Sequence, residues 1–130
     1  MKPIDLVSGD VVNEAIRIHR ELGPRLLESV YEIVLEGALK RAGYQVDRQR
    51  PINIKFDGMV FEKAFKIDLL VDHRLVIEIK SVEQFSRAHM KQLHTYLRLI
   101  NQPVGLLLNF SAATMKEGIH RVVNDHRPGS

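Results

Sequence analysis

The chain contains no cysteine. This absence excludes disulfide bonds, zinc sites built on thiolates, and enzymes that use a cysteine nucleophile. It also gives no sign of an oxidising compartment, so a cytoplasmic location is the expectation.

Long apolar runs are absent as well. One of the longest, Val104–Leu108, is far shorter than the roughly 20 residues that a membrane-spanning helix needs. The first residues also lack the apolar core of a signal peptide, so we expect no membrane segment. A chain of 130 residues with 45% hydrophobic and 27% charged residues is typical of one globular domain, expected over residues 1–130.

Basic residues are concentrated in the last third of the chain. The net charge is +3 and the pI is near 9.3. From Gln84 onward the charged residues are Arg87, Lys91, Arg98, Lys116, Arg121 and Arg127 against Glu117 and Asp125. This segment is either a surface that faces phosphates or an ordinary solvated helix face, and charge alone does not separate the two.

Hydrophobic periodicity predicts two helices at the start of the chain. The first is expected over 10–22, ended by Gly23-Pro24, and the second continues to Arg41, with Gly43 after its end. The apolar face expected for the second helix consists of Leu27, Val30, Tyr31, Val34, Leu35, Ala38, Leu39 and Ala42.

Strand signals follow. Alternation and an Asp57-Gly58 turn predict an antiparallel meander at 52–56, 60–71 and 75–82, irregular near Glu62-Lys63. A helix over 85–101 and a strand over 104–110, buried on both faces, then form a crossover. A short helix and a strand are expected between 114 and 124, and residues 127–130 are expected to be a frayed end.

Three charged residues interrupt the apolar strands of this meander. Glu78 and Lys80 lie two apart and therefore on one face, and Asp68 lies among apolar residues of the preceding strand. If the loop 72–74 pairs Val71 with Leu75, continued pairing places Asp68 opposite Glu78. Their side-chain carbons would be ~4.5–5.5 Å apart, where like charges are destabilising. A positive charge between them is therefore expected.

Two groups can supply that charge. Lys80 can do so within a buried structural network. A divalent cation can do so if Asp68, Glu78 and the Ile79 carbonyl are its ligands, because such hard oxygen donors suit Mg²⁺ or Mn²⁺. A water made acidic by the metal and held near Lys80 is a nucleophile able to hydrolyse a phosphodiester.

Asp68 and Glu78-Ile-Lys80, after a helix that bears Glu28, resemble the PD-(D/E)XK nuclease superfamily. More narrowly, the meander and three further segments resemble the subfamily named for its GxxExxY motif. These segments are Leu22–Tyr31, Gln92–Tyr96 and Val104–Phe110. The resemblance covers about residues 10–124 and implies an α/β fold with a restriction-endonuclease-like core (αβββαβ), a mixed sheet flanked by helices.

The resemblance also implies roles for individual residues. Asp68 and Glu78 correspond to metal ligands, Lys80 to the catalytic lysine, and Glu28 to an acid that binds metal directly or through water. Gln92 and Tyr96 match a Gln-x-x-x-Tyr motif of the exonuclease domains of bacterial recombination helicases, and both are expected to line the site, Gln92 in support of the catalytic residues and Tyr96 at the substrate.

The residues themselves leave the role of Glu28 open. Glu28, Glu32 and Glu36 form a stripe on the second helix, which is commonly a solvated acidic face. On a helical wheel Glu28 lies closest of the three to the expected apolar face, centred near Val34 and Ala38. It is therefore the acid of the three that could reach a site, and the resemblance is what selects it.

Two positions depart from the motifs. Ile67 replaces the proline of the superfamily name, which active members often lack. Arg25 replaces the glycine of GxxExxY, and either binds phosphate or marks an inactive copy.

The sequence thus predicts a Mg²⁺- or Mn²⁺-dependent nuclease acting on nucleic acid, with DNA as the expected substrate. One alternative is a catalytically inactive nuclease-fold module that binds nucleic acid or a protein partner. Another is a structural homodimer in which the Asp68, Glu78 and Lys80 network only fixes the register of the strands.

Overall fold

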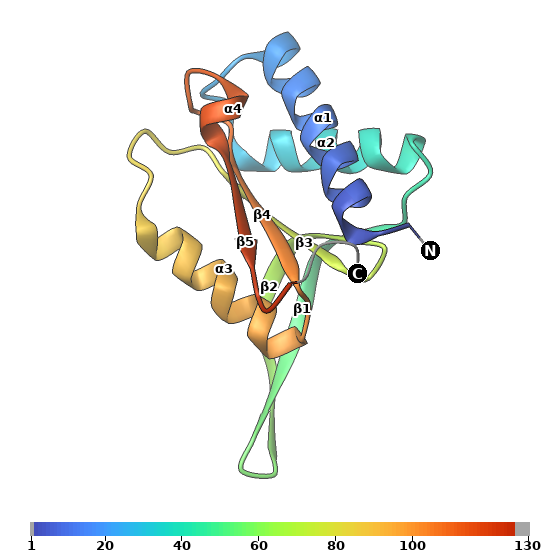
Figure 1. The fold of residues 1–130 in the computed structure, drawn as a ribbon. Coiled ribbons are helices and arrows are strands. Elements are labelled where there is room, and N and C mark those ends of the chain that lie inside the picture. The colour runs from blue at the N-terminus through green and yellow to red at the C-terminus, as the bar shows by residue number, and fades with distance from the viewer. Residues whose placement is uncertain (1, 127–130) are drawn as a thin grey trace.

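The computed structural model describes residues 2–126, so the frayed end expected at 127–130 lies outside this range. The elements follow the expected order of helices and strands (Figure 1). They are α1 (Ile4–Leu22), α2 (Glu28–Arg41), β1 (Val46–Phe56), β2 (Met59–Val71), β3 (Leu75–Lys80), α3 (Arg87–Ile100), β4 (Val104–Asn109), α4 (Met115–Gly118) and β5 (Ile119–Val123).

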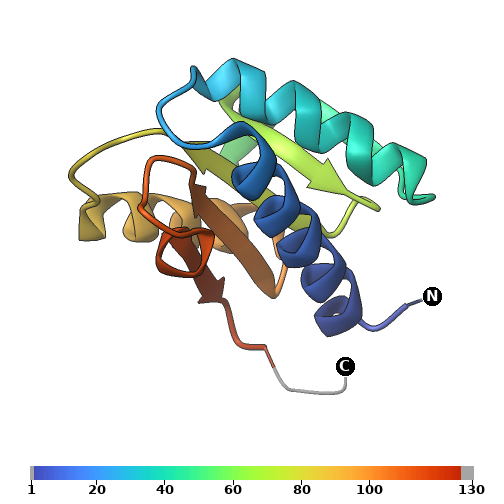
Figure 2. The same ribbon diagram turned by 90° about the horizontal axis from the view of Figure 1, so that it is seen from above.

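The strands form one mixed sheet in the order β1-β2-β3-β4-β5. β3 and β4 are parallel, joined by the α3 crossover, and the other neighbours are antiparallel. Helices α1 and α2 cover one face and α3 covers the other (Figure 2), which divides the core into two clusters. The expected αβββαβ core, from α2 to β4, is confirmed, and β4 is buried along its whole length.

Two elements begin earlier than the periodicity predicts. Helix α1 starts at Ile4 rather than near residue 10, because Ile4 and Val7 extend its buried stripe across the polar segment 8–10. Strand β1 starts at Val46 rather than Ile52, since Val46 is buried beneath the helices. At the other end of the meander, β3 ends at Lys80, two residues before the expected Val82.

The buried face of α2 differs from the expected one. Tyr31, Leu35, Ala38 and Leu39 are buried, and so is the acid Glu32. The exposed apolar residues of this region are Leu22, Leu26, Leu27, Val30, Ile33 and Val34. Apolar residues extend around more than one face of this helix, and packing against α1 and the sheet selects the Tyr31–Leu35 face.

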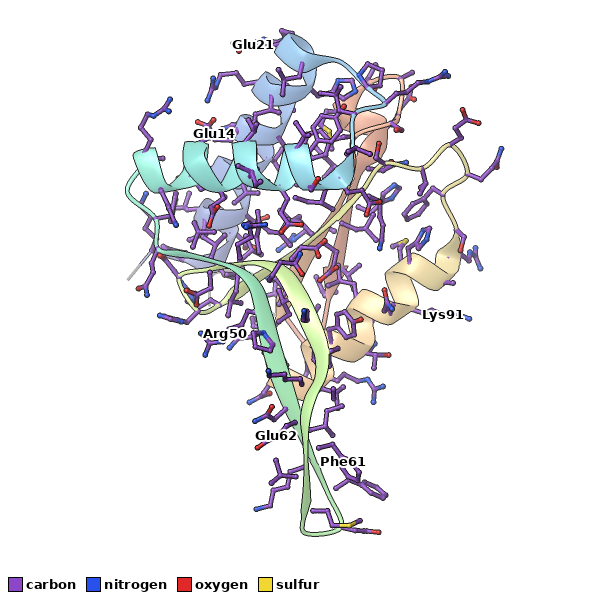
Figure 3. The ribbon with its side chains drawn as sticks, turned by 180° about the vertical axis from the view of Figure 1, so that it is seen from behind. Glu14, Glu21, Arg50, Phe61, Glu62 and Lys91 are labelled. Atoms are coloured by element: carbon purple, nitrogen blue, oxygen red, sulfur yellow. The ribbon has the colours of Figure 1, made fainter. Side chains whose placement is uncertain are left out.

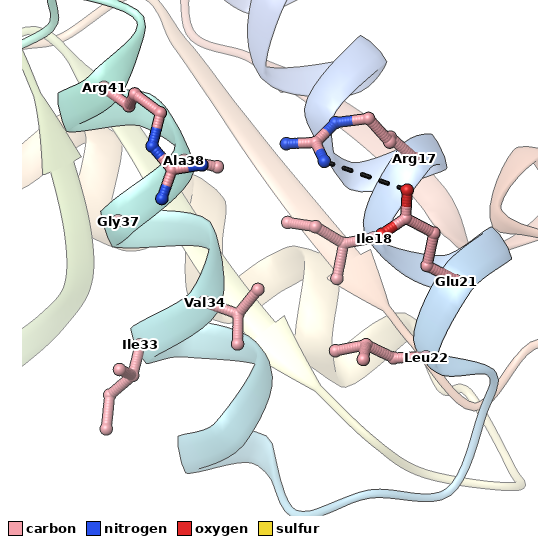
Figure 4. Close-up of a pocket in the computed structure, with 9 residues that line it drawn as sticks. All are labelled: Arg17, Ile18, Glu21, Leu22, Ile33, Val34, Gly37, Ala38 and Arg41. Atoms are coloured by element: carbon pink, nitrogen blue, oxygen red, sulfur yellow. Dashed lines mark ion pairs between the residues drawn. The ribbon is translucent and has the colours of Figure 1, made fainter.

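Part of the exposed face borders a cavity of about 320 Å³ between α1 and α2 (Figure 4). Its walls combine apolar side chains such as Val34 with the Arg17–Glu21 ion pair (3.9 Å). The acidic pair of the sheet is not part of this cavity.

A long hairpin of β1 and β2 projects from the body of the molecule (Figures 1 and 3). We call residues 50–66 the arm. Its tip is the expected Asp57-Gly58 turn, in which both residues have positive φ (52° and 72°). The register shifts between Ile52 and Ile54, opposite Lys63 with a φ of 52°, which confirms the expected irregularity near Glu62-Lys63.

Helices capable of crossing a membrane are not found among residues 2–126.

Candidate active site

The backbone ladder between β2 and β3 ends next to the two acidic residues. Val71 pairs with Leu75 across the loop 72–74, as expected, and the ladder continues to Leu69 and Ile77. The next pair in this register would be Asp68 and Glu78. The predicted register is therefore confirmed up to the acidic pair, where backbone pairing stops.

Side chains replace the backbone hydrogen bonds at this point. The N–H of Ile79 donates to Asp68 Oδ2 (2.8 Å), and the N–H of Asp68 donates to Glu78 Oε1 (3.4 Å). Each carboxyl group thus binds the backbone of the opposite strand. The sequence correctly brings the two acids together, but they meet across a gap in the ladder rather than as a regular cross-strand pair.

The gap coincides with a kink in the neighbouring strand pair. Gln49 of β1 has a φ of 54°, and the ladder between β1 and β2 skips the position where Gln49 faces Asp68. Alternation in β2 also fails here, because Ile67 and Leu70 both pack in the α3 cluster. Asp68 therefore lies where the arm leaves the sheet.

The carbonyl of Ile79 is oriented toward the same gap. The N–H and C=O of a strand residue point to the same side of the strand, and the Ile79 N–H points to Asp68. The next carbonyl, that of Lys80, points the other way and accepts from Phe110 N (2.9 Å). Three oxygen donors can thus face the gap, from Asp68, Glu78 and Ile79.

Glu78 is the most strongly perturbed acid of the site. Its side chain is only 6% exposed, and this burial, followed by the charge of Asp68, raises its pKa to about 9. Lys80 lies near enough to oppose the shift. Among residues 2–126, however, Lys80 forms no ion pair. The alternative in which Lys80 neutralises the acids by direct contact is not observed.

Tyr96 of α3 lies close to this pair. Burial raises the pKa of its hydroxyl, and the charges of Glu78 and Asp68 raise it further. Its ring stacks on Phe65 of the arm, with centroids 4.1 Å apart and planes 9° apart. Gln92, one turn earlier on α3, is exposed, and the hydrogen bonds of the two acids given above do not include it.

Glu28 lies beside the end of β3 rather than with the acidic pair. As the first residue of α2, it accepts a hydrogen bond from Ser81 N (2.9 Å), directly after Lys80. The Ser81 hydroxyl in turn donates to Leu26 O (2.8 Å). Within residues 2–126, no three His, Cys, Asp or Glu residues gather closely enough to hold a metal. The structure thus does not place Glu28 as a third carboxylate ligand.

Glu32 and Gln49 lie near the acidic pair of Asp68 and Glu78 instead, and neither was predicted from the sequence. The Gln49 amide donates to Glu32 Oε1 (2.8 Å) and to Asp68 Oδ1 (3.2 Å). Glu32 is buried, which raises its pKa, and Arg48 pairs with it at 3.4 Å. A wheel centred on Leu35 instead of Val34 would have placed both Glu28 and Glu32 within about 60° of the buried face without choosing between them, whereas no sequence signal indicates Gln49.

The donors at the gap fit a divalent cation that keeps several of its waters. Two carboxyl groups and one carbonyl are hard oxygen donors, and cations such as Mg²⁺ are commonly bound through one or two carboxylates. Burial, followed by the charge of Asp68, raises the pKa of Glu78, so ionisation of the pair requires additional positive charge. A cation would supply it.

The Leu22–Tyr31 segment forms a turn that is fixed by Tyr31. This buried tyrosine stacks on Phe110 (4.3 Å). Its hydroxyl donates to Gly23 O (2.5 Å) and accepts from Leu26 N (3.1 Å). Arg25, inside the turn, has a φ of 73°, a conformation that favours glycine. It lines a cavity of about 400 Å³ with Glu28, Ser81, Glu83 and Ser111, among others.

Replacing Arg25 by glycine is expected to stabilise the protein by about 1 kcal/mol, because glycine adopts this φ without a Cβ clash. Thermal unfolding should show a rise in Tm of about 4 °C. Arg25→Ala keeps the Cβ and serves as the control, with no comparable gain. Equal Tm values for the two variants would show that the turn is not strained.

Comparisons with known proteins agree with this architecture. The crystal structure of SSO0001 matches with a TM-score of 0.57 and 20% sequence identity, over 91% of this chain and 66% of that chain. A likeness at this identity concerns the fold alone. No curated protein matches the chain. The sequence profile described as the PD-(D/E)XK nuclease superfamily matches residues 5–122. The chain therefore belongs to the PD-(D/E)XK nuclease superfamily.

Proposed function

We propose that this protein is a nuclease that hydrolyses DNA phosphodiesters with the help of Mg²⁺ or Mn²⁺. The observation that carries the proposal is the pair of carboxyl groups, Asp68 and Glu78, held at the gap in the ladder with no ion-pair partner among residues 2–126. Superfamily membership independently indicates a nuclease.

Asp68, Glu78 and the Ile79 carbonyl would hold the cation. When bound, it supplies Lewis acidity and lowers the pKa of water. The chain's own contribution is to orient these donors. The Ile79 N–H and the Gln49 amide fix the two oxygens of Asp68, and Glu32 anchors Gln49 from behind.

Lys80 is assigned two tasks at the reacting phosphate. Its ammonium group holds the attacking water by hydrogen bonding and offsets the negative charge that develops on the phosphate oxygens. Because no carboxylate pairs with it among residues 2–126, the group is free for both. Glu28 supports this position indirectly, since its bond to Ser81 N fixes the end of β3.

Three further residues are assigned to substrate. Tyr96 lies beside the acidic pair, and the exposed Gln92 lies one turn away on the same helix. Arg25 is 76% exposed and lines the cavity beside Ser81, where its guanidinium is suited to a phosphate of the bound strand.

We further infer that the chain belongs to the GxxExxY subfamily. The turn at Leu22–Tyr31 supports this assignment, because each motif position has a physical role in it. Tyr31 fixes the turn, Glu28 binds the end of β3, and the glycine position has a positive φ even though Arg25 occupies it.

The function is tested by Mn²⁺ titration calorimetry together with cleavage of supercoiled plasmid DNA. The wild-type protein should take up Mn²⁺ and cleave, whereas Asp68→Asn should lose at least about tenfold in Mn²⁺ affinity and lose cleavage. Asparagine keeps an oxygen that accepts from Ile79 N–H, so we expect Asp68→Asn to retain the fold. Circular dichroism of the variant checks this.

Two results would contradict the proposal. Cleavage that survives in Asp68→Asn, after contaminating nuclease is excluded, would assign the activity elsewhere. Salt-dependent DNA binding without Mn²⁺ uptake or cleavage would identify an inactive nucleic-acid-binding module.

A further inference from the structure

The arm has two chemically different faces. Residues paired across antiparallel strands share a face, and the register joins Ile52 to Phe65, Ile54 to Phe61 and Phe56 to Met59. One face is therefore apolar from Ile52 outward, beyond Arg50 at its base. The other face carries the pairs Pro51 with Lys66 and Lys55 with Val60.

The apolar face begins at the candidate site and continues outward. At its base, Ile52 and Phe65 pack against the α3 cluster, and Phe65 stacks on Tyr96 beside the acidic pair. Farther out, Phe61 and Phe56 are 47% and 63% exposed. Figure 3 shows Phe61 and Glu62 on opposite sides of the projecting ribbon. A row of aromatic rings thus runs from Asp68 and Glu78 to the tip.

The arm also carries exposed cations, and the register places two of them, Lys55 and Lys66, on the face opposite the rings. Lys55, Lys63 and Lys66 are exposed. None of them forms an ion pair in the part of the chain that the structure describes. Their charges are available for phosphates.

We propose that the arm binds single-stranded nucleic acid, with unpaired bases stacked on Phe56 and Phe61 and phosphates along the edges of the two-stranded ribbon, where the long lysine side chains reach them. Stacking on aromatic rings combined with a basic track is the general way in which proteins hold single strands without reading sequence. A duplex keeps its base faces covered by its own stacking, so a single strand is favoured. The further step, that the bound nucleic-acid strand continues to Asp68 and Glu78, rests on the proposed function.

The test is fluorescence anisotropy of a labelled 20-nucleotide oligothymidine titrated with full-length protein in EDTA, where metal-dependent cleavage cannot occur. Phe56→Leu and Phe61→Leu are each expected to weaken binding at least about fivefold, because leucine keeps apolar area but removes the ring. Phe61→Trp should bind at least as tightly as the wild type. Val60→Ser, equally close to the tip but on the other face, should change affinity less than twofold.

Two results would overturn the inference. One is unchanged affinity in both leucine variants, and the other is binding of the corresponding duplex as tight as that of the single strand. Light scattering, which measures the oligomeric state, tests a third outcome. A dimer that Phe56→Ser breaks and Phe56→Leu preserves, with oligonucleotide affinity unchanged in both, would show that a second copy covers the face instead.

The same measurements separate this inference from the proposed function. Ring-dependent binding in EDTA by a wild-type protein that cleaves nothing in Mn²⁺ would refute the nuclease and leave the arm as a single-strand binder. Cleavage in Mn²⁺ by a protein whose oligonucleotide affinity does not depend on Phe56 and Phe61 would refute the arm as a single-strand binder and leave the nuclease proposal intact.

Discussion

Replacing Lys80 by methionine is expected to reduce DNA cleavage at least about 100-fold, while Mn²⁺ binding persists. Methionine keeps a long side chain and removes only the ammonium group, which we assign to the attacking water and the developing phosphate charge. Losses of ~10²–10⁴-fold are typical when a proton-transfer group or a transition-state donor is removed. Single-turnover cleavage under saturating Mn²⁺ measures the loss, and calorimetry measures the metal.

Lys40→Met is the matched control, because Lys40 is an exposed lysine of α2 paired with Glu36 at 3.2 Å. It should cleave at the wild-type rate. If Lys80 only fixed strand register, Lys80→Met would instead lower the unfolding temperature and leave the rate per folded molecule intact. That result would reject the catalytic assignment.

Replacing Glu78 by glutamine is expected to stabilise the metal-free protein at pH 8 but not at pH 4. The folded pKa of Glu78 is raised to about 9 from the ordinary 4.5, so the folded protein keeps a proton that the unfolded chain releases. The stability linked to this proton is fully present below pH 4.5 and is lost as pH rises toward 9. The slope is at most about 1.4 kcal/mol per pH unit.

Glutamine keeps an oxygen for the N–H of Asp68 and remains neutral at every pH. At pH 8 the gain over the wild type should be about 2 kcal/mol or more, and thermal unfolding in EDTA across pH 4–9 measures it. Glu36→Gln, on the partly exposed Glu36, is the control and should lack this growing difference. Parallel curves for the wild type and Glu78→Gln would show that Glu78 is ionised without metal.

Added Mn²⁺ should reverse the order of these two proteins at pH 8. A cation that binds the ionised pair stabilises the folded state by mass action, and it displaces the proton from Glu78. Glu78→Gln lacks one carboxylate ligand and should gain little. Stabilisation of both proteins by the same amount would place the metal somewhere else.

Sequence rules for turns and strand register predicted that Asp68 and Glu78 lie close together, because this part of the site depends on local structure. The three-residue loop 72–74 fixes the register of β2 and β3, and the register alone brings Asp68 to Glu78. The same argument could not predict that the ladder ends there, because the kink at Gln49 lies on a third strand. No propensity rule favours a positive φ at glutamine.

The choice of acid on α2 shows a second limit. Apolar residues on this helix form two stripes, and only contacts with α1 and the sheet decide which one is buried. With Leu35 buried, Glu28 and Glu32 both lie near the buried face, and their positions along the helix separate them: Glu28, the first residue of α2, binds the end of β3, whereas Glu32, one turn later, binds Gln49. The positive φ of Arg25 was not predicted, although the glycine that the motif has at this position could have indicated it.

The junction of the arm with the sheet has a mechanical consequence. Asp68 lies at the point where the ribbon bends away, between the kinked Gln49 and the last rung of the β2–β3 ladder. The arm thus joins the sheet at Asp68, which is a candidate metal ligand. Because Asp68 is bonded both to Gln49 of the bent strand and to Ile79 of β3, a change in the direction of the arm would change the position of Asp68 relative to Glu78.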